Sequence, residues 1–349
     1  MTVVVKLGSS LVATPAGSVR RGLLVRRAAE IAAVVRGGEP VAVVSSGAIA
    51  LGLPYLGRHG RPRSVPKLQA ASALGQARLQ HAWEQALRRE EVHAAQVLLT
   101  ATDVADRGAY VNARNALNAL FAVPAVPVVN ENDTTATDEI TFGDNDALAA
   151  QVALLVRARL LVLLTEVEGV FTRAPGTPGA ELLDEGTAAK DAVLGDASRL
   201  GRGGMRSKVL AAEMAAAAGI PTVIAAGTGD RVLGPILAGE PRGTRFHGAE
   251  QAQPAYKLWL RFGKPLAGRL HVDAAARRAV ARDGRSLLAV GVVGTDGRFD
   301  AGDAVELVGP DGAPFAKGIA GAGADELAAR PRGVEAVHRD RLVLYSDSG

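Results

Sequence analysis

Short runs of β-branched residues and leucine alternate with longer segments of helical period through about residue 245. A parallel strand connection needs a helix-length return, so this alternation predicts an α/β domain with a mainly parallel sheet sandwiched by helices. We expect strands at residues 3–7, 41–44, 97–99, 125–129, 160–164 and 222–226. We expect helices at roughly residues 22–36, 67–89, 110–121, 145–157 and 207–218, the last ended by Gly219 and followed by Pro221.

The pattern changes beyond residue 254, where short strands are separated by turns that contain glycine and aspartate. One short helix is expected there, at Ala274–Ala281. A chain of 349 residues also exceeds what one hydrophobic core usually serves. We therefore expect an α/β domain at residues 1–245, a linker at 246–255 and a smaller, mostly β domain at 256–349.

Composition excludes several classes of protein. The chain has no cysteine, which rules out disulfides and thiolate chemistry, and its six histidines lack the close spacing of a zinc-binding pair. No apolar run has the length that a membrane-spanning helix needs, and no secretory leader is recognised at the N-terminus, so we expect a cytoplasmic protein. A formal net charge of +4 is weak support for nucleic-acid binding.

Two strand ends near the N-terminus carry glycine, hydroxyl groups and a lysine. Residues 6–10 read Lys-Leu-Gly-Ser-Ser, where Gly8 lets a phosphate approach the backbone and Lys6 supplies positive charge. A plain surface turn is the alternative. Residues 45–49 read Ser-Ser-Gly-Ala-Ile before a helical stretch whose free N–H groups suit an anion, with simple N-capping by Ser46 as the alternative.

A third strand end is rich in acidic and amide side chains. Residues 130–135 read Asn-Glu-Asn-Asp-Thr-Thr, and residues 142–146 read Phe-Gly-Asp-Asn-Asp. Such a cluster suits recognition of an ammonium group and the positioning of lysines. A calcium loop is disfavoured, because residues 144–146 lack the alternating spacing and the terminal glutamate of an EF-hand.

A glycine-rich loop that opens onto a helix is the strongest single motif. Residues 201–208 read Gly-Arg-Gly-Gly-Met-Arg-Ser-Lys, and a further turn follows the strand that ends near Thr165. The glycines allow the backbone to wrap a phosphate chain, and Lys208 lies at the favourable N-terminus of the helix. A flexible surface loop is the alternative. The chain contains no Walker A sequence.

Taken together, these loops supply two lysines but no activated nucleophile, histidine base or metal cluster. Phosphoryl transfer needs this combination, because its transition state is stabilised mainly by alignment and by positive charge on the equatorial oxygens. A carboxylate acceptor would need no general base, since it is already nucleophilic.

The chain resembles the amino acid kinase family at five ordered motifs, residues 4–10, 45–49, 130–134, 143–146 and 203–208. The resemblance implies that ATP donates a phosphoryl group to the side-chain carboxylate of L-glutamate, the first step of proline synthesis, with Mg²⁺ held chiefly by ATP oxygens. It further implies that Lys6 and Lys208 stabilise the transferring group and that Asp146 holds both lysines in place.

The same resemblance implies the binding residues. Glutamate would contact Ser46, Asp133 and Asn145. The nucleotide would contact Lys6, Gly8, Ser9, Thr165, Glu166, Arg202, Gly203, Gly204, Met205, Arg206, Ser207 and Lys208. The chain departs from the family pattern at Glu166 and Glu168, where aspartate is common, and at Arg202, Arg206 and Ser207, where smaller or hydroxylated residues are common.

From about residue 256 the chain resembles a PUA domain, most clearly at residues 268–273 and 302–305. PUA domains often bind RNA, yet residues 255–349 carry 14 Lys and Arg against 12 Asp and Glu, so charge does not predict RNA binding. The family resemblance further implies a homodimer or homotetramer and feedback inhibition by proline. Two other hypotheses stay open at this point: a kinase for another acceptor, such as N-acetylglutamate, aspartate or a nucleoside monophosphate, and an RNA-binding protein whose α/β domain is a scaffold.

Overall fold

The computed structural model describes residues 1–57, 62, 64–135, 145–194, 204–264 and 266–345. The chain divides into two compact units, Met1–Ala252 and Gln253–Gly349. Each unit has its own sheet and its own apolar core. None of the helices in the described ranges is long and apolar enough to cross a membrane.

A seven-stranded sheet forms the centre of the N-terminal unit, in the order β3-β4-β2-β1-β5-β8-β9. Neighbouring strands are parallel except for the antiparallel pair β8 and β9. The predicted α/β fold class, with its mainly parallel sheet, is confirmed. The strands are β1 (Val3–Leu7), β2 (Val41–Ser45), β3 (His93–Leu99), β4 (Ala125–Glu131), β5 (Leu160–Thr165), β8 (Thr222–Ala226) and β9 (Thr244–Phe246).

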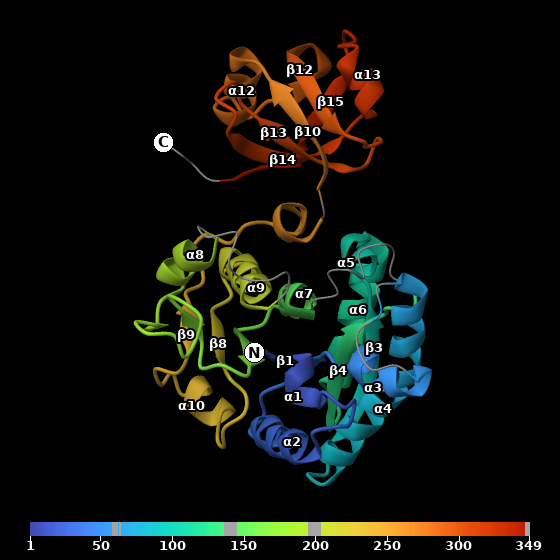
Figure 1. The fold of residues 1–349 in the computed structure, drawn as a ribbon, viewed down its shortest axis with the longest axis vertical. Coiled ribbons are helices and arrows are strands. Elements are labelled where there is room, and N and C mark those ends of the chain that lie inside the picture. The colour runs from blue at the N-terminus through green and yellow to red at the C-terminus, as the bar shows by residue number, and fades with distance from the viewer. Residues whose placement is uncertain (58–61, 63, 136–144, 195–203, 265, 346–349) are drawn as a thin grey trace. The chain divides into compact units, whose positions relative to one another are not determined.

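Helices cover both faces of this sheet, with α2 and α4 on one face and α7 and α9 on the other (Figure 1). A short hairpin, β6 (Val170–Phe171) and β7 (Leu182–Leu183), follows β5. The helices are α1 (Ser9–Val12), α2 (Arg21–Arg36), α3 (Ala48–Gly52), the 3₁₀ turn η1 (Leu53–Leu56), α4 (Val65–Arg88), α5 (Ala101–Ala105), α6 (Arg107–Leu120), α7 (Asn145–Leu155), α8 (Gly186–Leu194), α9 (Met205–Ala217) and α10 (Leu233–Leu237).

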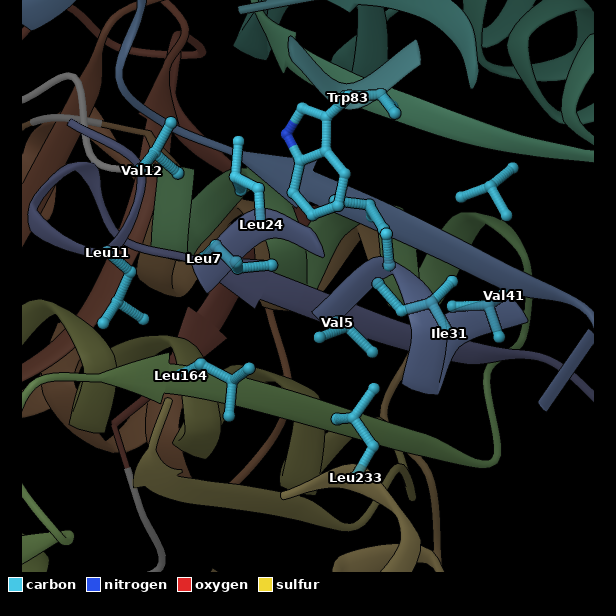
Figure 2. Packing of buried hydrophobic residues seen from close by; sticks show 14 of the residues in the cluster. Val5, Leu7, Leu11, Val12, Leu24, Ile31, Val41, Trp83, Leu164 and Leu233 are labelled. Carbon is cyan, nitrogen blue, oxygen red and sulfur yellow. The ribbon is translucent and has the colours of Figure 1, made fainter. Parts of the chain in front are cut away.

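The alternation of side chains along β1 decides where its lysine points. Val5 and Leu7 join the apolar cluster that includes Leu24 of α2 and Trp83 of α4 (Figure 2). Successive side chains of a strand project from opposite faces, so Lys6 projects toward the face covered by α7. The strand therefore anchors the core with one face and presents a buried ammonium group on the other.

Local chemistry explains most differences from the sequence prediction. Strand β3 begins four residues before the predicted start, because it lies at the edge of the sheet and its half-exposed first residues lack an apolar run. Helix α7 ends two residues early, since Arg157 adopts a left-handed backbone with φ of 50°. The sequence reading missed α8 and the antiparallel edge strand β9, both too short to show a clear period. Gly219, predicted to end this helix, lies just after the cap residue of α9 and adopts a left-handed φ of +79°.

The C-terminal unit contains a six-stranded sheet in the order β11-β15-β14-β13-β10-β12, in which only β10 and β13 pair in parallel. Leu270, Val305 and Leu307 are among the buried residues of its core. Its elements are α11 (Ala255–Leu258), the π-helix η3 (Trp259–Gly263), β10 (Leu266–Val272), α12 (Ala274–Ala281), β11 (Leu287–Leu288), η4 (Ala289–Gly291), β12 (Val292–Gly297), β13 (Ala304–Val308), β14 (Pro314–Ala320), α13 (Ala324–Ala328) and β15 (Glu335–Leu344). The predicted smaller, mostly β unit and its helix at Ala274–Ala281 are present. The expectation of a single helix is wrong, because the unit also contains the short helices α11 and α13 and the π-helix η3, which are too short to show a clear helical period.

Candidate active site

The carboxyl ends of the central parallel strands bring the sequence motifs to one edge of the sheet. Leu7 of β1 lies in register with Ser45 of β2 on one side and with Leu164 of β5 on the other. The residues that follow these three strand ends are therefore neighbours, although they lie far apart in the sequence. In open α/β sheets this edge is where ligands bind.

Two lysines contact one carboxylate at this edge. Lys6 Nζ forms a close ion pair with Asp146 Oδ1, and Lys208 Nζ lies 3.0 Å from Asp146 Oδ2. All three side chains are buried, and Asp146 has no exposed surface. A buried ammonium group is costly unless it is paired, so the shared carboxylate offsets the cost of burying both groups and holds both of them at the same site. These three side chains carry one net positive charge, which favours an anionic ligand.

Asp146 is itself held by its position in α7. It lies in the first turn of that helix, where the helix dipole favours a negative charge. The hydroxyl of Ser207 donates to Asp146 Oδ2 at 2.8 Å, so the oxygen that faces Lys208 also accepts from the preceding residue of α9. The carboxylate thus joins the N-terminal turns of α7 and α9.

The N-terminus of α9 presents backbone N–H groups that have no capping side chain among the described residues. Gly204 caps this helix with a left-handed φ of 115°, and no side chain satisfies the first N–H groups through a cap. Met205 is half-buried and Arg206 is exposed in the first turn. Such a helix start suits phosphate oxygens. Arg202 and Gly203, predicted to contact the nucleotide, lie outside the described residues, as do residues 142–144.

Gly8 leaves space next to Lys6. It has an ordinary φ of −67° at the start of α1, so its backbone alone would accept another residue. A Cβ atom placed there would lie 3.9 Å from Lys6 Nζ and 3.8 Å from the carbonyl oxygen of Leu164. Ser9, which follows, is exposed. The glycine therefore keeps the approach to the lysine open.

Thr165 and Glu166 lie where β5 ends. The carbonyl of Thr165 accepts from the N–H of Gly227 at 2.7 Å, which ties the end of β5 to the loop after β8. Glu166 is exposed, and so is Glu168. The turn is thus fixed through its backbone, while its carboxylates stand in solvent.

Three residues are predicted to bind glutamate. Ser46 follows β2, Asp133 lies just after β4, and Asn145 is the first residue of α7. Asn145 Nδ2 donates to Ser46 Oγ at 2.9 Å, so these two residues are in direct contact. Asp133 is buried and accepts a 2.6 Å hydrogen bond from Ser72 of α4. The alternative of simple N-capping by Ser46 is wrong, because Gly47 occupies the cap of α3 and no side chain makes a capping bond there.

Sequence reasoning missed the contribution of α4. Its residues Ser72 and Gln76 bond to Asp133 and to Asn130 respectively, but no local motif marks them as part of a site. Their only signal is that polar residues interrupt an apolar helical stripe, which is common on any helix. No cluster of three or more His, Asp or Glu side chains that could hold a metal ion occurs within the described ranges.

A parallel α/β sheet with two lysines on one buried carboxylate, beside a glycine-capped helix start, defines a phosphotransferase domain. The sequence comparisons agree with this class: the model of the amino acid kinase family matches residues 1–226, which is more than half of the chain, and the chain belongs to that family. A PUA domain matches residues 268–340. Both resemblances expected from the sequence are confirmed.

Curated relatives span nearly the whole chain. Proteins from Acinetobacter baylyi and from Geobacter sp. strain M21, each described as glutamate 5-kinase, are 40% identical to it over 361 residues. A glutamate 5-kinase from Burkholderia ambifaria is 41% identical over 360 residues. Each alignment covers 98% of this chain and 96% or 97% of the relative.

Proposed function

We propose that the protein transfers the γ-phosphoryl group of ATP to the side-chain carboxylate of L-glutamate and yields L-glutamyl 5-phosphate, the first step of proline synthesis. The observation that carries the proposal is the pair of lysines on the Asp146 carboxylate. The names of the relatives, which align over 98% of the chain, support glutamate as the acceptor.

In the proposed reaction, a carboxylate oxygen of glutamate attacks the γ-phosphorus, and the bond between that phosphorus and the bridging β-phosphate oxygen breaks, so that ADP leaves. Lys6 and Lys208 neutralise the charge that spreads over the equatorial oxygens. Asp146 positions both ammonium groups. The attacking carboxylate carries no proton at neutral pH, so the reaction needs no general base.

The acceptor site is proposed to use the side chains after β2 and β4. The carboxylate of Asp133 would pair with the ammonium group of glutamate, while Ser46 and Asn145 would hydrogen-bond to the rest of the substrate. An acceptor whose amino group is acylated would lose the ion pair with Asp133. The ion pair with Asp133 would therefore favour glutamate over N-acetylglutamate.

The nucleotide site is proposed to lie along the start of α9 and the ends of β1 and β5. The phosphates of ATP would accept hydrogen bonds from the backbone N–H groups at the start of α9. The individual nucleotide-binding residues named from the sequence stay predictions. When bound, Mg²⁺ would neutralise part of the phosphate charge. As the family resemblance implies, this ion would enter with ATP and would be held mainly by ATP oxygens.

Hydroxylamine trapping tests the proposal directly. Incubation with ATP, Mg²⁺ and glutamate should yield glutamyl hydroxamate, and Lys208→Ala should lower the turnover by at least about a hundredfold because a buried charge donor is lost. Lys67→Met, at an exposed position of α4, is the matched control and should keep full activity. Absence of hydroxamate above the enzyme-free background would rule out glutamate as acceptor, and parallel reactions with aspartate and N-acetylglutamate would identify another.

Four finer expectations stay predictions: the boundaries at residues 245 and 256, the homodimer or homotetramer, inhibition by proline and a cytoplasmic location. RNA binding by the PUA domain stays a hypothesis that the charge of the domain does not support.

A further inference from the structure

The buried face of α4 contacts the acceptor site at two points one helical turn apart. Ser72 Oγ donates to Asp133 Oδ2 at 2.6 Å, and Gln76 Oε1 accepts from Asn130 Nδ2 at 2.8 Å. Residues four apart on a helix lie on the same face, so one rigid element holds both partners. Neither Ser72 nor Gln76 follows a strand end or belongs to a glycine-rich loop.

Helix α4 is held at a fixed distance from the site by its contact with α3. A Cβ atom at Gly75 would lie 1.8 Å from the carbonyl oxygen of Ala48, and one at Gly52 would lie 1.8 Å from that of Ala71. The two helix backbones therefore touch, and glycine is required at both positions. Because α3 directly follows the Ser46 turn, this contact fixes α4 relative to the acceptor residues.

A relay of hydrogen bonds links Gln76 to Ser46 through the amides of Asn130 and Asn145. The backbone N–H of Glu131 sets its direction. The N–H of Glu131 can only donate, and it bonds to Asn145 Oδ1 at 3.2 Å. Asn145 must then present Nδ2 to its other two partners, Ser46 Oγ and Asn130 Oδ1, each at 2.9 Å. Asn130 in turn presents Nδ2 to the oxygen of Gln76.

This direction has a consequence for the hydroxyl of Ser46. Its oxygen accepts from Asn145, so its single hydrogen is not used in that bond and serves as a donor. A donor hydroxyl favours a carboxylate oxygen as its ligand. If the amide of Asn145 were reversed, its oxygen would accept the hydroxyl hydrogen and the donor would be lost.

We propose that Ser72 and Gln76 are positioning residues of the acceptor site: Gln76 accepts the last hydrogen bond of the relay and so holds Asn130 and Asn145 in the direction set by the N–H of Glu131, which leaves Ser46 a donor, and Ser72 holds Asp133 in the orientation that receives the ammonium group. The inference rests on the proposed function. It assigns the selectivity for an amino acid with a free amino group partly to a helix that carries none of the predicted substrate contacts.

Gln76→Met tests the relay, because methionine has a similar length but no strong acceptor. The KM for glutamate should rise about tenfold, the cost of one hydrogen bond in a buried network, while the KM for ATP stays unchanged. Gln80→Met is the matched control: Gln80 lies one turn farther along α4, and its amide bonds to the carbonyl of Ala94 in β3 rather than to the site.

A double-mutant cycle separates the relay from general loosening of the helix. In a Ser46→Ala background the donor hydroxyl is already gone, so adding Gln76→Met should raise the KM for glutamate little further. If the two effects multiply, or if Gln80→Met raises the KM as much as Gln76→Met does, the relay is not what Gln76 supports and the inference is wrong.

Ser72→Ala tests the second contact with a substrate analogue. The KM for glutamate should rise about tenfold, whereas the inhibition constant of glutarate, which lacks the amino group, should not change. An equal effect on both compounds, or on neither, would overturn the role of Ser72. Wild-type protein that forms no glutamyl hydroxamate would defeat the proposed function itself, whereas active wild-type protein with unaffected variants would defeat only this inference.

Discussion

Lys6 and Lys208 come from opposite ends of the N-terminal unit's sequence, yet their ammonium groups contact the two oxygens of the same buried carboxylate. One lysine belongs to the first strand and the other to the first turn of α9. Neither is placed by its own element alone. The carboxylate of Asp146 determines where both ammonium groups lie, and the proposed phosphoryl transfer depends on that arrangement.

Asp146→Asn should impair both stability and catalysis. The amide keeps the shape of the side chain but leaves two buried ammonium groups without their counter-charge, and breaking a buried pair costs about 3–5 kcal/mol. We expect a clearly lower melting temperature and a turnover reduced by at least about a hundredfold. Calorimetry and hydroxamate trapping measure the two effects. Asp230→Asn, in an exposed ion pair with Arg26, is the control and should change neither, since surface pairs contribute little.

Gly8→Ala should separate activity from stability. Its ordinary φ and the ordinary contact distances of an added Cβ predict a folded protein with an unchanged melting temperature. The new methyl group would lie beside Lys6 Nζ, where the phosphoryl group is proposed to pass, so turnover should fall about tenfold or more. Steady-state kinetics combined with thermal unfolding would decide this, and an alanine variant of full activity would show that nothing passes there.

Gly75→Ala should destabilise the N-terminal unit. The added methyl group would overlap the backbone of α3, and overpacking of this kind typically costs about 1–3 kcal/mol or more. The KM for glutamate should rise as well, because α4 would be displaced. The same substitution at Gly22 of α2, where a Cβ meets only Arg26 at 3.8 Å, should be neutral or slightly stabilising. Urea denaturation of the two variants provides the comparison, and similar midpoints would contradict the close helix contact.

Lys317 of the C-terminal unit should make stability rise with pH. Burial lowers its pKa from 10.5 to about 8, although its ammonium group donates to the carbonyl of Arg261 at 3.3 Å. Between these two values the unfolded chain binds more protons than the folded one, so the folded state gains stability as pH rises, by about 3 kcal/mol in total. Below pH 8 this gain is absent.

Lys317→Met removes that titration. The stability of wild-type protein relative to the variant should therefore increase between pH 8 and pH 10 in chemical denaturation. Lys257→Met, at an exposed lysine of the same unit, is the control and should show a constant difference. A constant difference for Lys317→Met too would mean that this side chain is not desolvated.

Local pattern was enough to predict the fold class, most central strands and the segments that carry the two lysines. The strands could be predicted because buried strands need runs of apolar residues. In a parallel sheet all carboxyl ends meet at one edge, so residues 6–10, 45–49 and 130–134, which lie at strand ends, could be assigned to one site. The C-terminal β unit was likewise evident from its turns. Edge strands were harder, because β3 and β9 are stabilised by pairing rather than by an apolar run.

Which side chain bonds to which was decided by the packing of elements. The pattern of α4 shows that Ser72 and Gln76 lie on its buried face, but it does not show that the end of β4 lies opposite. That juxtaposition depends on the backbone contact between α3 and α4, which forms only when both helices are packed on the same sheet. A hydrogen bond requires two groups within about 3 Å, and such distances between remote segments exist only in the folded chain.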